Sequence, residues 1–159
     1  MHFYTIGVYG LIEEEFFKKL QNYNIDLFCD IRQRRGVRGK KYSFVNSIRL
    51  QNKLKELNIN YLHIKELAPT SEIRDKQKED DKQNNILKRE RYKLGDAFIN
   101  EYNNCILKNY DFSNLLSYIK ENNYQNIVFF CVEKEFLACH RSLVANELKN
   151  KYNFNVQDI

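Results

Sequence analysis

The sequence predicts a single three-layer α/β/α domain over residues 1–159, with a mostly parallel central sheet. Short apolar runs alternate with longer amphipathic segments, and this order favours parallel strands joined by right-handed crossovers. The most apolar run, residues 127–132, shows no polar alternation, which is typical of a central strand covered on both faces. The 159 residues, 43% hydrophobic and 30% charged, fit one domain of ordinary size.

The first elements along the chain are a strand, a helix and a second strand. Residues 3–9 form an apolar run with aromatic and β-branched side chains, as in a buried strand. Residues 11–23 carry apolar side chains at helical spacing, with three acidic residues in the first turn, where the helix dipole favours them. Residues 26–31 are again short and mostly apolar, which predicts the second strand.

The middle of the chain adds a helix, a strand and a long charged section. Residues 47–58 have an apolar stripe at helical spacing, and Ser47 is the expected N-cap. Residues 60–64 predict the third strand. A turn containing Pro69 then opens a section that continues to about residue 109. This section is predicted to be helical, but its pattern does not fix its topology.

The last third of the chain is predicted to contain a helix, a strand, a helix and a strand. The first helix begins at Asp111 or Ser113, either of which can cap it, and runs through residue 121. The strand at residues 127–132 follows. The remaining elements are a helix at residues 138–149 and a short strand within residues 154–159.

Several classes of protein are excluded by composition. No stretch reaches the roughly 18 to 20 uninterrupted apolar residues that a membrane span needs. The first residues predict a strand rather than a basic segment followed by an apolar one, so no export signal is expected. The four cysteines are then expected to be reduced thiols. We expect a cytoplasmic protein without a membrane partner.

The placement of charge is more informative than its sum. The formal net charge is +5, which alone does not identify a nucleic-acid-binding protein. Residues 32–41, called the basic loop below, contain six basic side chains and no acidic one. Residues 72–91 instead mix both signs, which is typical of a solvated helix.

The residues with useful chemistry follow the predicted strands at one edge of the sheet. Ligands of open parallel sheets bind beyond the carboxyl ends of the strands. The candidate site residues that gather there are Asp30, Arg32, Arg34, Arg35, Arg38, Glu66, Glu133, Cys139, His140 and Arg141.

Cys139 is the candidate nucleophile of this group. A cysteine at the start of a helix, beside His140 and Arg141, is expected to have a lowered thiol pKa. Glu133 and Asp30 are the candidate general base and orienting acid. These acids have a second interpretation, as anchors for arginines, and Cys139 has a second interpretation as packing. The Cys-x5-Arg spacing of phosphatase and sulfurtransferase loops does not occur here.

A metal site is an alternative that the sequence leaves open. Cys131, Cys139 and His140 offer three ligands, and His63 or Cys29 could supply a fourth. The Cys-x7-Cys-His spacing is unusual for structural zinc. The site assignment therefore names no metal residue, and the cofactor is left unknown.

The basic loop is the candidate binding element. Arginines among glycines, followed by Tyr42 and Phe44, suit phosphates and exposed bases. With Arg141, these arginines predict a phosphate-bearing small molecule or a nucleic acid as partner. The leading hypothesis is an enzyme acting on such a ligand, and the rival is a non-catalytic nucleic-acid-binding module with structural cysteines.

Three further side chains are assigned to the core, and one to an ion pair. His63, Cys29 and Cys105 are expected to be packed residues rather than ligands. Arg141, close to the sheet end, is expected to pair with Asp30 or Glu133, because a buried guanidinium needs a partner.

These motifs resemble the family called domain of unknown function 488 (DUF488). The resemblance is carried by Thr-Ile-Gly at 5–7, Asp-Ile-Arg at 30–32 with the basic loop, residues 61–67, and Cys-x-Glu with Cys-His-Arg-Ser at 131–142. It extends from about residue 5 to residue 159 and is similar to a subgroup with a longer basic loop. Val8 stands where many members have a histidine. The resemblance implies an α/β fold and an intracellular setting, and it implies no particular reaction.

Overall fold

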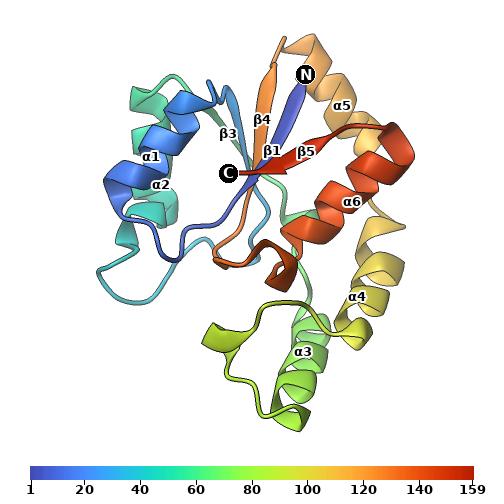
Figure 1. The fold of residues 1–159 in the computed structure, drawn as a ribbon. Helices are drawn as coiled ribbons and strands as arrows, with labels where there is room; N and C mark the ends of the chain where they lie inside the picture. The colour runs from blue at the N-terminus through green and yellow to red at the C-terminus, as the bar shows by residue number, and fades with distance from the viewer.

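A computed structural model confirms the α/β architecture. It describes the backbone of residues 1–159 and every side chain except that of Arg89. Figure 1 shows a central sheet with α1 and α2 on one side and α5 and α6 on the other. The strands are β1 (His2–Ile6), β2 (Leu27–Asp30), β3 (Asn60–His63), β4 (Asn126–Phe130) and β5 (Val156–Asp158). The helices are α1 (Glu13–Asn22), α2 (Ser47–Glu56), α3 (Ser71–Gln83), α4 (Asp96–Tyr102), α5 (Phe112–Glu121) and α6 (Arg141–Tyr152).

The sheet is parallel throughout the described residues, with the strand order β3-β2-β4-β1-β5. The apolar run after residue 126 occupies the central strand, as the sequence predicts. Phe129 and Phe130 are fully buried because helices cover both faces. The register pairs Asp30 with His63 on one side and with Phe130 on the other, so the strand ends form one rim.

Each face of the sheet has its own apolar core. On one face, alternate side chains of β4 such as Phe129 pack with α5 and α6, for example with Leu115 and Val144. On the other face, Phe130 packs with α1 and α2. None of the described helices has the length and apolar character required to cross a lipid bilayer.

The helix ends follow simple local chemistry, with one correction. Asn46, not Ser47, is the N-cap of α2, and Ser47 is its first residue. Asp111 caps α5 by accepting a hydrogen bond from the Ser113 backbone nitrogen, as predicted. Asn24, Asn58 and Asn123 adopt positive φ at the turns after α1, α2 and α5, which asparagine tolerates better than most residues.

The charged middle section lies at the bottom of the molecule in the view of Figure 1. Thr70 caps α3, which ends at Gln83, and α4 continues into the turn of π-helix Asn103–Leu107. In Figure 1, α3 and the segment that follows it lie beyond the carboxyl ends of the strands. The rim that holds the predicted site residues is therefore covered by a segment whose position the sequence pattern leaves open.

Candidate functional site

A cavity of about 500 Å³ lies at the carboxyl rim, under α3, and we call it the cysteine cavity. Its volume falls in the range of small-molecule sites, which is roughly 300–1,000 Å³. It is lined by residues 32–34, 36–38, 131–133 and 138–140, together with Tyr9, Pro69, Arg74, Gln77, Lys78, Asp81, Lys88, Arg91, Leu94 and Phe98.

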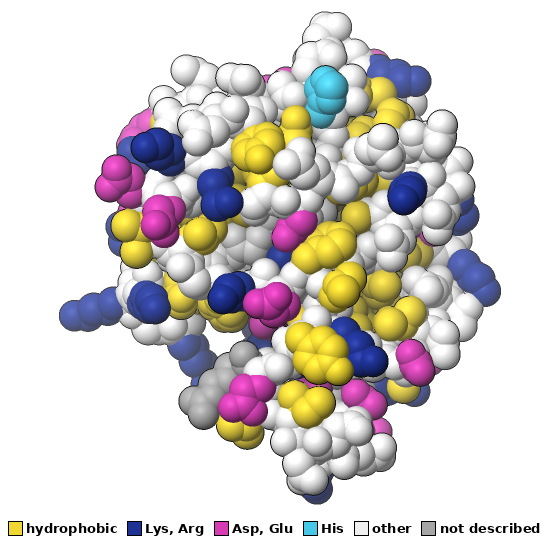
Figure 2. All heavy atoms as spheres, in the orientation of Figure 1, with side chains coloured by type: hydrophobic (Ala, Val, Ile, Leu, Met, Phe, Trp, Pro, Cys, Tyr) yellow, Lys and Arg dark blue, Asp and Glu magenta, His cyan; other side chains and the backbone are white. Residues whose placement is uncertain are grey.

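The lining of the cysteine cavity is strongly cationic. Cations come from the basic loop, from α3 and from the segment after α3, whereas Asp81 and Glu133 are its acidic residues. In the view of Figure 2, Lys and Arg side chains gather over the loop between β2 and α2. The lining cations are Arg32, Arg34, Arg38, Arg74, Lys78, Lys88 and Arg91.

Both acidic residues of the lining are already paired. Asp81 accepts from Arg91 at 2.8 Å. Glu133 lies 3.1 Å from the Lys88 Nζ. Two acids outside the lining are paired with its cations as well, Asp30 with Arg32 and Asp75 with Lys78. The excess of positive charge therefore rests on Arg34, Arg38 and Arg74, and it favours an anionic ligand.

Two buried donors of the lining have no partner among the described residues. They are Nη1 of Arg32 and Nε of Arg91. A buried N–H without an acceptor costs free energy, and such groups are rare in native proteins. Both side chains line the cavity, so an anion bound there would lie beside them.

Cys131, Cys139 and His140 form a cluster at the inner end of the cavity. Nδ1 of His140 lies 3.8 Å from the sulfur of Cys131 and 3.8 Å from the sulfur of Cys139. All three ligand atoms lie within 4.8 Å of one another. Cys131 follows β4 directly and Cys139 precedes α6, so the loop between them brings the two thiols together.

The two thiols of this cluster differ in acidity. Burial raises the pKa of the Cys139 thiol. Three interactions that lower this pKa outweigh burial: the hydrogen bond with Cys131 and the contacts with His140 and Arg141. They lower the pKa of the Cys139 thiol well below its usual value, in the direction that the sequence predicts. The hydrogen bond to Cys139, and then burial, raise the pKa of Cys131 well above its usual value.

Asp30 lies next to the cavity but does not line it. It is fully buried, and it holds Arg32 through two hydrogen bonds, to Nε at 2.8 Å and to Nη2 at 2.7 Å. The Arg32 backbone nitrogen donates a third bond to the Asp30 carboxylate at 3.1 Å, and the Tyr61 hydroxyl donates a fourth at 2.9 Å. The geometry matches the interpretation of Asp30 as an anchor for an arginine. Of the two residues, Arg32 is the one that lines the cavity.

Arg141 is not among the residues that line the cavity, and its side chain is fully buried. It pairs with the carboxylate of Asp158 in β5 at 3.1 Å, so the expected pairing with Asp30 or with the Glu133 carboxylate is wrong. Its remaining donors bind the carbonyl oxygens of Glu133 at 2.6 Å and of Lys134 at 3.0 Å. Arg141 thus positions the loop that carries Glu133.

Glu66 and His63 lie apart from the cysteine cavity. Both line a second cavity of about 640 Å³ beside α5, so the expected grouping of Glu66 with Cys139 is wrong. His63 is half-buried, and its Nε2 lies 2.9 Å from the Arg32 carbonyl oxygen. Cys29 is buried, as expected, but Cys105 is exposed, contrary to the expectation that it is core.

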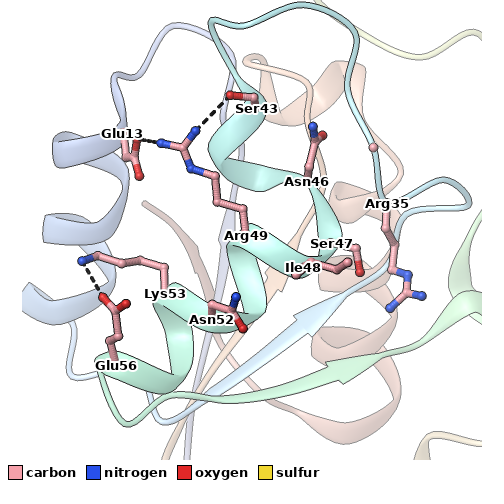
Figure 3. Close-up of a pocket in the computed structure, with 11 residues that line it drawn as sticks. Glu13, Arg35, Ser43, Asn46, Ser47, Ile48, Arg49, Asn52, Lys53 and Glu56 are labelled. Carbon is pink, nitrogen blue, oxygen red and sulfur yellow. Dashed lines mark hydrogen bonds and ion pairs between the residues drawn. The ribbon is translucent and has the colours of Figure 1, made fainter.

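The basic loop is divided between two surfaces. Arg34 and Arg38 line the cysteine cavity, whereas Arg35 lines a shallow groove along α2. Figure 3 shows this groove, where Arg49 of α2 extends toward Glu13 of α1. That exposed ion pair measures 2.6 Å. None of the residues that line this groove is buried.

Four cations of the cavity were missed by sequence reasoning. Arg74, Lys78, Lys88 and Arg91 belong to the segment whose mixed charges predict a solvated helix. Nothing in the local pattern reveals that one face of α3 covers the sheet rim. The length of the connection between β3 and α5 is the one feature of the sequence that indicates an additional packed segment here.

Comparison with known proteins gives one result. A family model described as "Domain of unknown function DUF488" matches residues 13–148. No curated protein and no solved structure matches the chain. The matched range contains most of the cavity lining, including the basic loop and the Cys131–Cys139–His140 cluster.

Proposed function

The chain belongs to the family described as domain of unknown function DUF488, and we propose that it is an enzyme that binds a nucleotide in the cysteine cavity. The observation that carries the proposal is the pair of partnerless buried donors, on Arg32 and Arg91, in a lining rich in cations. Phosphate oxygens satisfy guanidinium donors in charge-assisted hydrogen bonds.

The remaining lining suits the rest of such a ligand. Tyr9 and Phe98 present aromatic side chains to the cavity, and aromatic rings stack on bases. Cys139 and Glu133 line the same cavity, so the chemistry is proposed to occur at that end. Arg34 and Arg38 are exposed, and they lie where a bound phosphate would meet solvent.

The rival ligand is a nucleic acid strand, which the exposed Lys40 and Lys41 of the basic loop favour. The two ligands differ in their dependence on salt. Binding of a single strand weakens with a slope near −0.7 per neutralised phosphate in a log–log plot. A mononucleotide neutralises fewer charges and gives a shallower slope.

The test is calorimetric titration with adenosine diphosphate and with a short single-stranded oligonucleotide, each at several salt concentrations. Loss of one charge-assisted contact is worth about tenfold in affinity, so Arg34→Ala and Arg38→Ala should each weaken nucleotide binding by about that factor. Arg35→Ala removes the same charge from the same loop outside the cavity, and it should change affinity by less than about twofold.

Each result has a definite meaning. Tighter binding of the oligonucleotide, with a steep salt slope, would replace the nucleotide by a nucleic acid strand. An equal effect of all three substitutions, or no binding of either probe by the wild type, would overturn the cavity as the phosphate site.

A further inference from the structure

The inner end of the cysteine cavity presents a donor set that the phosphate ligand does not explain. Two cysteine sulfurs and one imidazole nitrogen converge there, and all three side chains are buried. We propose that Cys131, Cys139 and His140 bind one Zn²⁺ ion whose fourth coordination position faces the cavity.

The separations between the ligand atoms fit a tetrahedral zinc ion. With Zn–S near 2.3 Å and Zn–N near 2.05 Å, sulfur and nitrogen at two corners of a tetrahedron lie about 3.6 Å apart. Both sulfur-to-Nδ1 distances are 3.8 Å. Each sulfur-to-nitrogen distance therefore needs to shorten by only about 0.2 Å, and the two sulfurs lie within 4.8 Å of each other.

His140 is held in the orientation and tautomer that a zinc ligand needs. Its Nε2 lies 3.0 Å from the carbonyl oxygen of Ile31, and a carbonyl oxygen accepts but never donates. Nε2 therefore carries the proton, and in the neutral ring Nδ1 offers its lone pair to the metal. A metal-bound histidine is usually supported by a hydrogen bond of this kind, from the ring nitrogen that does not bind the metal.

The donor set selects zinc over the hard cations. Thiolate and imidazole ligands suit Zn²⁺, whereas Mg²⁺ and Ca²⁺ require oxygen ligands. Two thiolates and a neutral imidazole balance the charge of Zn²⁺. In the described part of the chain, no other histidine, cysteine or acidic residue lies in this cluster as a fourth ligand. His63 and Cys29 therefore do not supply it.

Three protein ligands with one open position are typical of catalytic rather than structural zinc. This explains why the spacing of these residues along the chain is unlike that of a structural site. The zinc proposal does not depend on a phosphate ligand, since it rests on the cluster alone.

The experiment measures zinc directly. The purified full-length chain is stripped with a chelator, incubated with ZnCl₂, desalted and analysed for zinc by mass spectrometry. Wild type and Cys105→Ser, whose cysteine is exposed and outside the cluster, should retain one Zn²⁺ per chain. Cys131→Ser, Cys139→Ser and His140→Gln should bind Zn²⁺ more than about 100-fold more weakly, because losing a ligand exceeds the 10–100-fold effect of losing its support.

A second measurement needs no variant and therefore does not depend on how the substituted chains fold. Iodoacetamide is applied to wild type with and without Zn²⁺, and the labelled peptides are identified. Zinc should protect Cys131 and Cys139 and leave labelling of Cys105 unchanged. A failure of wild type to retain zinc, or labelling of Cys131 and Cys139 to the same measurable extent in both samples, would overturn the proposal. Nucleotide affinity is measured separately, so either proposal can fail without the other.

Discussion

Asp30 and Arg32 show how a buried ion pair orients a side chain of the cavity lining. The carboxylate of Asp30 is fully buried, and its two bonds to the Arg32 guanidinium, from Nε and Nη2, fix the plane of that group. That plane lies over the ring of Phe130, with 4.6 Å between the guanidinium carbon and the ring centroid. One donor of Arg32 is left without a partner beside the cavity. The acid that sequence reasoning placed in the chemistry instead orients an arginine of the cavity lining.

Replacement of Asp30 by Asn tests this buried pair. The substitution keeps the shape of the side chain but leaves the buried charge of Arg32 uncompensated, so unfolding should cost about 3–5 kcal/mol less. Urea unfolding followed by circular dichroism measures the difference. Arg49→Ala breaks the exposed pair with Glu13 and should cost no more than about 1 kcal/mol. Equal losses for the two variants would contradict the account of Asp30.

Tyr61 makes the stability of the fold sensitive to pH in the alkaline range. Burial, and then the negative charge of Asp30, raise the pKa of Tyr61 to about 12. An unfolded tyrosine titrates near pH 10. The folded state thus holds the phenolic proton more tightly, and this stabilisation is present below about pH 10 and is lost as the pH rises toward 12.

The prediction is a difference between two unfolding curves. Between pH 10 and 12, the free energy of unfolding should fall more steeply for wild type than for Tyr61→Phe, which has no proton to lose. Urea unfolding at several pH values measures both slopes. Parallel slopes would show that the Tyr61 hydroxyl is not held in this environment.

Among the elements, the loops after β1 and β4 lie in close contact with each other. The backbone nitrogens of Val8 and Tyr9 donate to the carbonyl oxygen of Val132, at 3.3 and 3.0 Å. A Cβ added at Gly7 would overlap the Glu133 carbonyl oxygen and lie 3.3 Å from Nη2 of Arg141. Gly7 therefore allows the two loops to approach, and the loop after β4 carries the acid and both thiols of the site.

Substitution of Gly7 by Ala should displace the loop that carries Glu133. We expect a loss of about 1–3 kcal/mol in the free energy of unfolding, as for other overpacked sites, together with weaker nucleotide binding. Gly36→Ala is the stability control, since its Cβ would meet nothing closer than the Asn46 Oδ1 at 3.9 Å, and it should stay within about 0.5 kcal/mol of wild type. A Gly7→Ala protein as stable as the Gly36→Ala protein would show that the loops have room to separate.

For the molecule as a whole, the regular elements could be predicted because their patterns are local. The apolar run of β4 and the amphipathic stripes of α1 and α2 reveal burial without knowledge of their neighbours. The convergence of Cys139 and Glu133 on one rim follows from the parallel strand order. The partner of Arg141 could not be predicted, because it lies on β5, an edge strand that is the last element in the sequence.

The cover of the cavity could not be predicted for a similar reason. Charged residues of α3 have the same pattern whether they face solvent or an anion, so only the fold distinguishes Arg74 in the cavity wall from a solvated arginine. The same limit applies within the basic loop, where neighbouring arginines Arg34 and Arg35 serve different surfaces.

The most direct test of the central claim is a crystal structure of the protein with adenosine diphosphate. We predict that the diphosphate lies in the cysteine cavity, within hydrogen-bonding distance of Arg32 or Arg91 and beside Arg34 and Arg38 of the basic loop. Electron density for the nucleotide in the groove along α2, with an empty cysteine cavity, would contradict the account.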